Sequence, residues 1–373
     1  MMMEREVDLA FRVDASSKIG VGHVFRSRAI AAAGKERGLV SAFIASDMPE
    51  ELGQLLLYEG HRVSRIPSCR GVTSEEELWN VSQQHEDASL TIEALQGARP
   101  RALVVDHFSL AAPWHESVSP ATGALVCLDE LGGRDDACDV LVDPSPCEEG
   151  TKPRSRLRDR IELRGPAFAP VHPLFSQIRS RGLRRRTEVR RILINFGGAT
   201  NMVLVNAVLD VVLGSTDDDL PVDVVAGIAD RASDLGLRHQ ERVIVHDFSP
   251  RIAELMTDAD LMIGAGGSTL WERCALGLPS LTVATAPNQV SASAALNRLG
   301  ATVFAGEIFA DAEKSEVALN TLGTGLEALC ASSAALESMS ERAAGVTDGG
   351  GANRILRLAL AVDRLGAPAW RDR

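Results

Sequence analysis

The stretch "FRVDASSKIGVGHVFRSRAIAAAGKERG", Phe11 to Gly38, has the pattern of a buried strand, a glycine-rich loop and a long helix. Gly20 and Gly22 let the loop backbone approach a ligand closely, because glycine has no side chain. Loops of this kind between a strand and a helix usually bind phosphate, but here the third glycine of the dinucleotide-binding fingerprint is absent and His23 follows the second. The stretch therefore predicts an α/β unit with a histidine at its ligand-binding edge.

Beyond this stretch, short apolar runs alternate with longer helical patterns, which is typical of parallel sheets covered by helices. The strands predicted in the first half are residues 7–13, 41–46, 101–108, 124–130 and 138–144. Those predicted in the second half are residues 192–198, 221–227, 242–248, 259–267 and 279–285. Amphipathic helices are predicted within 315–345 and 352–366, on either side of a turn.

A chain of 373 residues is expected to form about two domains. We expect an N-terminal Rossmann-like domain over 1–180 and a C-terminal Rossmann-like, nucleotide-binding domain with terminal helices over 189–373. We interpret the basic segment between them, around 179–188, as a solvated linker, since a run of charge is more often solvated than ligand-binding. Ligands of two such units are expected in a central cleft, where strands end and helices begin.

Composition narrows the class of partner. The net charge of −12 argues against a nucleic-acid surface, so a small-molecule ligand is expected. The six cysteines include no C-x-x-C pair, and no apolar run approaches the ~18 residues of a membrane span, so a reduced, cytoplasmic protein without membrane contact is predicted. We expect neither a metal nor a cofactor, and we interpret the acidic cluster at 134–139 as a solvated turn. Oligomeric state is open, with a monomer favoured.

The segment 259–289 carries the clearest binding signal. A hydrophobic strand is followed by Gly266 and Gly267, and then by Ser268 and Thr269 at the start of a helix. Free N–H groups at such a helix start, together with the helix dipole, suit a pyrophosphate. Glu272, one turn into the helix, is placed to accept both hydroxyls of a ribose. The alternative for Glu272 is a helix-capping box with Thr269.

His23 is the candidate catalytic residue. The N-terminus of a helix disfavours imidazolium, so this histidine is expected to stay neutral near pH 7 and to accept a proton. Asp129 and Glu130 end a predicted strand, and they are weaker candidates for substrate contact.

The segments "RVDASSKIGVGHVFRSRAIA", "VVDHF", "CLDE", "DVLVDPSP", "LRGPAFAPVHPLF", "INFGGATN" and "IGAGGSTLWERCALGLP" with its following "NQ" resemble the UDP-2,4-diacetamido-2,4,6-trideoxy-β-L-altropyranose hydrolases of pseudaminic acid biosynthesis. This resemblance implies a GT-B fold and metal-independent hydrolysis at the anomeric carbon, with His23 activating water. It also implies UDP binding at the Gly-Gly-Ser-Thr and Trp-Glu-Arg motifs, and contact of the Asn-Gln pair with sugar and phosphates.

The predicted substrate-binding residues are Gly20, Gly22, Arg26, Asp106, His107, Phe108, Asn195, Gly197, Gly198, Gly266, Gly267, Ser268, Thr269, Glu272, Asn288 and Gln289. Two departures from the family concern the sugar. Phe108 stands where the family has tyrosine, and residues 168–175 lack the family's tyrosine hydroxyl, arginine and glutamate. The sequence therefore predicts the reaction type more firmly than the sugar.

The predicted reaction is attack of water, held by His23, at the anomeric carbon of a UDP-activated and amino-deoxy sugar, with inversion and release of UDP. A GT-B glycosyltransferase that uses a nucleotide sugar and an acceptor hydroxyl is the alternative, since the same nucleotide seat and base serve both. A nucleotide-binding protein without catalysis is a third reading. The sequence leaves the sugar, the choice between uridine and cytidine, and the pathway open.

Overall fold

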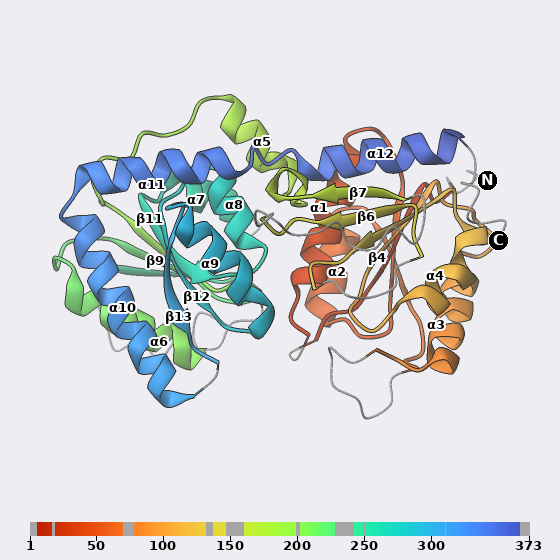
Figure 1. Ribbon diagram of the computed structural model, residues 1–373, viewed down its shortest axis with the longest axis horizontal. Helices are drawn as coiled ribbons and strands as arrows, with labels where there is room; N and C mark the ends of the chain where they lie inside the picture. Colours follow the sequence, from red (N-terminus) through yellow and green to blue (C-terminus); the bar gives the residue numbers. More distant parts are fainter. Residues whose placement is uncertain are drawn as a thin grey trace. The chain divides into compact units, whose positions relative to one another are not determined.

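The structure is a computed structural model that describes residues 6–16, 19–69, 78–131, 137–146, 160–198, 202–227, 242–248, 251–309 and 311–365. The chain forms two compact units, and each is described here by itself. Unit 1 comprises Met1–Pro173 and Gly350–Arg373, and unit 2 comprises Leu174–Gly349 (Figure 1).

Unit 1 is built on a seven-stranded sheet with the order β3-β2-β1-β4-β5-β6-β7, in which every pair is parallel. Its strands are β1 (Leu9–Val13), β2 (Ser41–Ala45), β3 (Arg62–Arg65), β4 (Ala102–Asp106), β5 (Ala124–Leu128), β6 (Val140–Asp143) and β7 (Ile161–Arg164). Strand order reverses between β1 and β4, which is the point where parallel α/β sheets bind ligands at their carboxyl ends.

Helices cover both faces of this sheet. They are α1 (Gly22–Lys35), α2 (Glu50–Tyr58), α3 (Val81–Ala94), α4 (Ala112–Val118), α12 (Gly351–Leu365) and the short turns η1 (Ser119–Ala121) and η2 (Pro166–Phe168). Helix α1 packs so closely that a Cβ on Gly34 would lie 2.5 Å from Leu9 Cδ1. On the other face, Trp114 and Ala88 pack against Ala10 in one core.

Unit 2 repeats the plan with a six-stranded parallel sheet of order β10-β9-β8-β11-β12-β13. Its strands are β8 (Ile192–Asn195), β9 (Val222–Val225), β10 (Val243–His246), β11 (Leu261–Ala265), β12 (Ser280–Ala284) and β13 (Val303–Glu307). Its helices are α5 (Pro173–Ser180), α6 (Met202–Ser215), α7 (Ile252–Asp258), α8 (Thr269–Ala275), α9 (Val290–Arg298), α10 (Ala312–Cys330), α11 (Ser333–Val346) and the turn η4 (Pro287–Gln289). Here the order reverses between β8 and β11.

All ten strands predicted from sequence are present, and three further strands were missed. Two of them, β3 and β7, are the two edges of the first sheet, and β13 is an edge of the second. Edge strands have one open side, and these three are only partly buried. They therefore lack the continuous apolar runs that identify buried parallel strands.

The units differ from the domain boundaries expected at 180 and 189. Helix α12 was expected in the C-terminal domain, but it packs against α1 and β5 and so belongs to unit 1. Its apolar pattern predicts a buried face and cannot say which sheet that face covers. Helix α5 lies almost wholly in unit 2, although it was expected in the N-terminal domain.

The interpretation of residues 179–188 as a solvated linker is incomplete, because arginines of this segment donate hydrogen bonds to backbone carbonyls. Arg179 donates to the carbonyls of Ala275 and Ala344, at the ends of α8 and α11. The buried Arg186 donates to the carbonyls of Leu276 and Gly277. Helix ends leave carbonyls without partners, and cationic side chains satisfy them and complement the dipole. Arg179 and Arg186 thus stabilise helix ends in unit 2.

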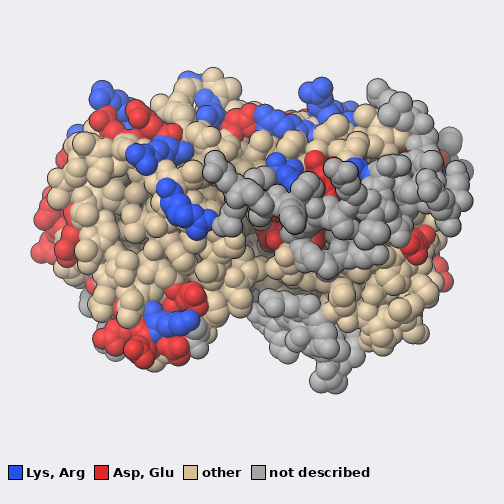
Figure 2. All heavy atoms as spheres, viewed as in Figure 1, with Lys and Arg blue, Asp and Glu red and all other residues tan. Residues whose placement is uncertain are grey.

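The structure shows where the charged side chains and the cysteines of the described residues lie. Among the described residues on the face in Figure 2, basic and acidic side chains are interspersed over both units. Cys127, Cys138 and Cys274 are buried free thiols, whereas Cys330 is an exposed one. In the described ranges, no helix has the length and apolar content to cross a bilayer.

Candidate functional site

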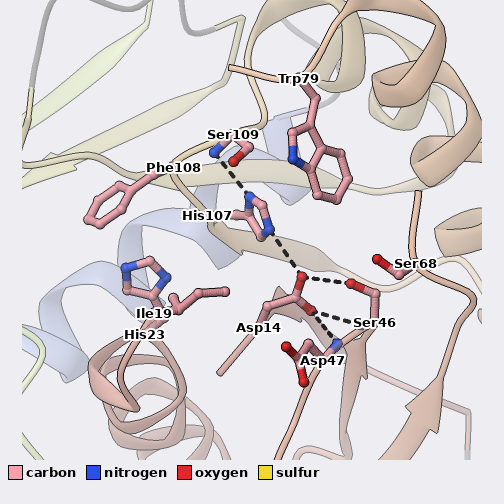
Figure 3. A pocket seen from close by; sticks show the side chains of 10 residues that line it. All are labelled: Asp14, Ile19, His23, Ser46, Asp47, Ser68, Trp79, His107, Phe108 and Ser109. Atoms are coloured by element: carbon pink, nitrogen blue, oxygen red, sulfur yellow. Dashed lines mark hydrogen bonds and ion pairs between the residues drawn. The ribbon is translucent and has the colours of Figure 1, made fainter. Parts of the chain in front are cut away.

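A pocket of unit 1 opens at the carboxyl ends of β1, β2 and β4, where strand order reverses (Figure 3). Its lining residues are Asp14, Ile19, His23, Ser46, Asp47, Ser68, Trp79, His107, Phe108 and Ser109. Its volume is about 110 Å³. Typical small-molecule pockets measure ~300–1,000 Å³, so this one holds only a small ligand or part of a larger one.

His23 lines this pocket as the second residue of α1, with 5% of its surface exposed. Gly20 precedes it with φ +77°, and a Cβ on Gly22 would meet no atom within 4 Å. There is therefore space beside the loop backbone, as a close approach of a ligand requires. Burial is the largest cause that lowers the pKa of His23, to about 4, while Asp106 opposes the shift and Arg26 adds to it. The imidazole is therefore neutral near pH 7, as expected, but mainly through burial.

Phe108 sets the orientation of the His23 ring. The two ring centroids lie 4.5 Å apart at an interplanar angle of 89°, an edge-to-face contact between two buried side chains (Figure 3). Such contacts hold aromatic rings in preferred geometries. The position where the resembling family has tyrosine thus carries a ring that packs on the histidine without a hydroxyl.

Asp106 and Arg26, both predicted to bind substrate, pair with each other behind His23. Arg26 Nε and Nη2 donate to the two oxygens of Asp106 at 2.9 and 2.8 Å, and its Nη1 donates to Glu130 at 2.6 Å. Asp106 is fully buried. His23 Nδ1 is also buried, makes no hydrogen bond, and lies 3.9 Å from Asp106 Oδ1. Asp106 is therefore placed to act on the histidine rather than on a ligand.

His107 has both ring nitrogens engaged. Its Nδ1 accepts the Ser109 N–H at 3.1 Å, so a ring proton lies on Nε2, which is 3.1 Å from Asp14 Oδ2. Burial alone raises the pKa of Asp14, but Arg12 and the bond from His107 outweigh it and hold that pKa well below its ordinary value. His107 presents a ring to the pocket and has no ring nitrogen left for a ligand.

Sequence reasoning missed seven lining residues: Asp14, Ile19, Ser46, Asp47, Ser68, Trp79 and Ser109. A signal existed for some of them. Asp14 follows β1 and Ser46 follows β2 directly, and residues at carboxyl ends of parallel strands meet at one edge. Trp79 lies in a loop before α3, and no local pattern distinguishes it from a core residue.

In unit 2, the glycines at the end of β11 and in the loop that follows it have two different roles. A Cβ on Gly264 would lie 2.4 Å from the Asn195 carbonyl oxygen, and one on Gly266 would lie 2.2 Å from Ser293 Oγ. These two glycines are required by packing. A Cβ on Gly267 would meet only Gln289 Nε2, at 3.8 Å. Gly267 therefore lies against open space, where a ligand can approach the backbone.

The predicted anion seat keeps free donors. No described residue accepts the backbone N–H of Gly267, Ser268 or Thr269, whereas the Gly266 N–H donates to Val283 O and Gln289 Oε1. Ser268 is the N-cap of α8 without a side-chain bond, and Glu272 is the fourth helical residue. The N-cap side chain thus makes no capping bond, and the structure shows no capping box at this helix start.

The remaining predicted residues lie beside this loop. Gln289 Oε1 accepts from Gly266 N, Thr285 N and Thr285 Oγ1, so its carbonyl organises the loop, and half-buried Asn288 precedes it in η4. Asn195 ends β8, and its Oδ1 accepts the N–H of Gly197 at 3.1 Å. Gly197, with φ +87°, and Gly198 follow on the same turn.

The acidic cluster at 134–139 lies partly outside the described residues. Asp139, within the described part, is buried and accepts the Leu125 N–H at 2.7 Å, so this residue is structural and the interpretation as a solvated turn is wrong for it. Among the described side chains no group of three or more His, Cys, Asp or Glu has the arrangement of a metal site.

Comparisons with known proteins bear on both units. Residues 196–353 match the family model described as Glycosyltransferase family 28 C-terminal domain. An uncharacterized protein of Methanocaldococcus jannaschii is 21% identical over 282 residues, covering 73% of this chain and 54% of that protein. The chain thus spans about half the length of the curated relative it matches.

Two solved structures resemble the whole chain. MurG of Acinetobacter baumannii superposes with a TM-score of 0.61 at 17% identity, covering 95% of this chain and 99% of that one. The spinosyn rhamnosyltransferase SpnG complexed with thymidine diphosphate gives 0.58 at 17% identity, covering 95% and 100%. At this identity the likeness shows the fold alone. The chain is an α/β protein with the GT-B fold, and residues 196–353 match a Glycosyltransferase family 28 C-terminal domain.

Proposed function

We propose that this protein transfers a glycosyl group from a nucleotide sugar, with His23 as the general base. The observation that carries the proposal is a neutral, buried histidine in a pocket at the strand-order reversal, 3.9 Å from a buried carboxylate. The match of residues 196–353 to a glycosyltransferase C-terminal domain supports a nucleotide-sugar donor, as does the thymidine diphosphate of one structural relative.

In the proposed mechanism, a proton on His23 Nδ1 is directed toward Asp106, which leaves the Nε2 lone pair to accept the proton of an attacking hydroxyl. The oxygen of that hydroxyl forms a bond to the anomeric carbon, and the bond from this carbon to the diphosphate breaks with inversion. Asp106 stabilises the imidazolium that forms, Arg26 fixes the position of Asp106, and Glu130 accepts a hydrogen bond from Arg26.

The leaving diphosphate is assigned to unit 2. The unoccupied N–H groups of Gly267, Ser268 and Thr269 supply donors for developing negative charge. Glu272 is assigned to the ribose hydroxyls. Gln289 keeps the loop in place through its three accepted hydrogen bonds.

Hydrolysis is the second candidate, with water in place of the acceptor. The pocket volume of about 110 Å³ favours it, because a small nucleophile suffices to fill that space. The resemblance of the sequence motifs to UDP-sugar hydrolases also favours it, and the motifs leave the identity of the sugar open. The two candidates share the base, the nucleotide seat and the bond that breaks, and they differ only in the nucleophile.

Nucleotide release from UDP-, CDP- and TDP-sugars, measured by chromatography with and without an alcohol acceptor, tests the proposal. Release that requires the acceptor supports transfer, and release in water alone supports hydrolysis. In ¹⁸O-water, hydrolysis at the anomeric carbon leaves the nucleotide unlabelled, so ¹⁸O in the nucleotide would contradict attack at carbon. Absence of nucleotide binding in calorimetry would end the proposal for both candidates.

A further inference from the structure

The described lining of the unit 1 pocket includes carboxylates and no cationic side chain. Two carboxylates, Asp14 and Asp47, line it, and neither lysine nor arginine does. His23 is neutral near pH 7 because burial lowers its pKa to about 4. The Nε2 of His107 faces Asp14, and its Nδ1 accepts the Ser109 N–H. The electrostatics of this pocket therefore oppose an anionic ligand.

Asp14 itself is fully committed within the protein. Its carboxylate accepts from Arg12 at 2.6 and 3.2 Å, and from the N–H and hydroxyl of Ser46 at 2.7 and 2.8 Å. Arg12 is completely buried and is shared between Asp14 and the equally buried Asp87. Neither the guanidinium nor the Asp14 carboxylate is available to a ligand.

Asp47 is in the opposite situation. Its backbone is pinned on both sides, since its N–H donates to Asp14 at 3.2 Å and its carbonyl accepts the Ala15 N–H at 2.8 Å. Its side chain is exposed and lines the pocket, and no described residue donates to its carboxylate (Figure 3). A fixed backbone with an uncommitted carboxylate is suited to accept hydrogen bonds from a ligand.

We propose that the pocket binds an uncharged or cationic, hydrogen-bond-donating part of the glycosyl unit, and that Asp47 selects for it through hydroxyl or ammonium groups. The indole of Trp79 and the ring of Phe108 provide apolar walls, as sugar rings require. Glycosyl units that carry a carboxylate are rejected. The inference rests on the proposed function for the identity of the ligand, because it names the sugar class of that same site.

Three nucleotide sugars that differ in charge test the selection: UDP-glucosamine, UDP-glucose and UDP-glucuronic acid. Calorimetry on the full chain is expected to give UDP-glucosamine roughly tenfold or more tighter binding than UDP-glucuronic acid, with UDP-glucose between them, as for hydrogen bonds to a charged group. In Asp47→Asn the ratio should fall to about threefold or less. Glu51→Gln, an exposed carboxylate of α2 outside the pocket lining, is the matched control and should keep the wild-type ratio.

Methyl glycosides of the same three sugars, titrated without nucleotide and followed by the imidazole NMR signals of His23 and His107, separate this inference from the proposed function. If the UDP compounds fail to bind while the glycosides bind in the expected order, the proposed function falls and the pocket inference stands. Equal binding of glucosaminide and glucuronide overturns the inference. So does an Asp47→Asn variant that binds with the wild-type ratio.

Discussion

The two units have the same strand order around their reversal points, yet they place opposite chemistry there. At β1 and β4, unit 1 gathers ionisable side chains, with His23, Asp106 and Arg26 in one buried network. At β8 and β11, unit 2 gathers glycines, amides and backbone N–H groups that no described residue accepts. The comparison teaches that one topology can carry either ionisable side chains or exposed backbone donors at its reversal point, and that the residues after the strands decide which; we propose proton transfer for the first and anion binding for the second.

The energetics of the two edges differ accordingly. Burying charged groups in unit 1 requires complete pairing, and Arg12, Asp14, Asp87, Arg26 and Asp106 are all paired. The edge of unit 2 needs close packing of backbone instead, which Gly264 and Gly266 permit. A substitution in unit 1 should therefore alter chemistry, whereas one in unit 2 should alter nucleotide binding or stability.

The sharpest test of this division is His23→Asn. Turnover is expected to fall by roughly 10²–10⁴, the contribution of a general base, while UDP affinity is expected to stay unchanged because the proposed nucleotide seat is in unit 2. Steady-state kinetics and calorimetry on the same preparation measure both. An equal loss of turnover and nucleotide affinity would show that His23 is not the general base, and it would contradict separate roles for the two units.

Glu272→Ala should have the next largest effect, on binding. Loss of hydrogen bonds between a charged group and the ribose is expected to weaken UDP affinity by ~1.5–3 kcal/mol. Calorimetry against UDP and 2′-deoxy-UDP measures the loss, which should be smaller for the deoxy compound. A folded variant with wild-type UDP affinity would disprove the ribose assignment.

The paired variants Gly266→Ala and Gly267→Ala distinguish packing from ligand access. The first is expected to lower the free energy of unfolding by ~1–3 kcal/mol, since its Cβ would lie 2.2 Å from Ser293 Oγ. The second should unfold like the wild type but bind UDP more weakly, because its Cβ occupies the open space at the seat. Urea unfolding and calorimetry compare them, and matching behaviour of the two would contradict the assigned roles.

The pKa of His23 gives the smallest predicted effect, on stability. Its folded-state pKa of about 4 lies below the ordinary 6.5, so between these values the unfolded chain binds more protons and stability rises with pH. The wild type should therefore lose ~1–3 kcal/mol more than His23→Gln between pH 6.5 and 4, and nothing more above pH 7. Urea unfolding at several pH values measures this difference, and parallel curves would show that His23 titrates normally.

The sequence by itself determined the class of fold, ten of the strands, and the two loops at which ligands are expected. Fully buried strands need unbroken apolar runs, and a strand followed by a glycine loop and a helix is a local pattern. The position of His23 at the start of α1 and of Ser268 at the cap of α8 followed from the same local rules.

Only the tertiary structure decided which residues join those loops. The partners of Asp14 lie at Arg12, Ser46 and His107, and the partner of Arg26 lies 80 residues away at Asp106. The sequence also left undetermined which of the two sheets α12 covers, since an amphipathic helix fits any apolar face of matching size. Local patterns depend on the spacing of apolar residues along the sequence. Long-range pairing depends on which strands the sheet order brings side by side.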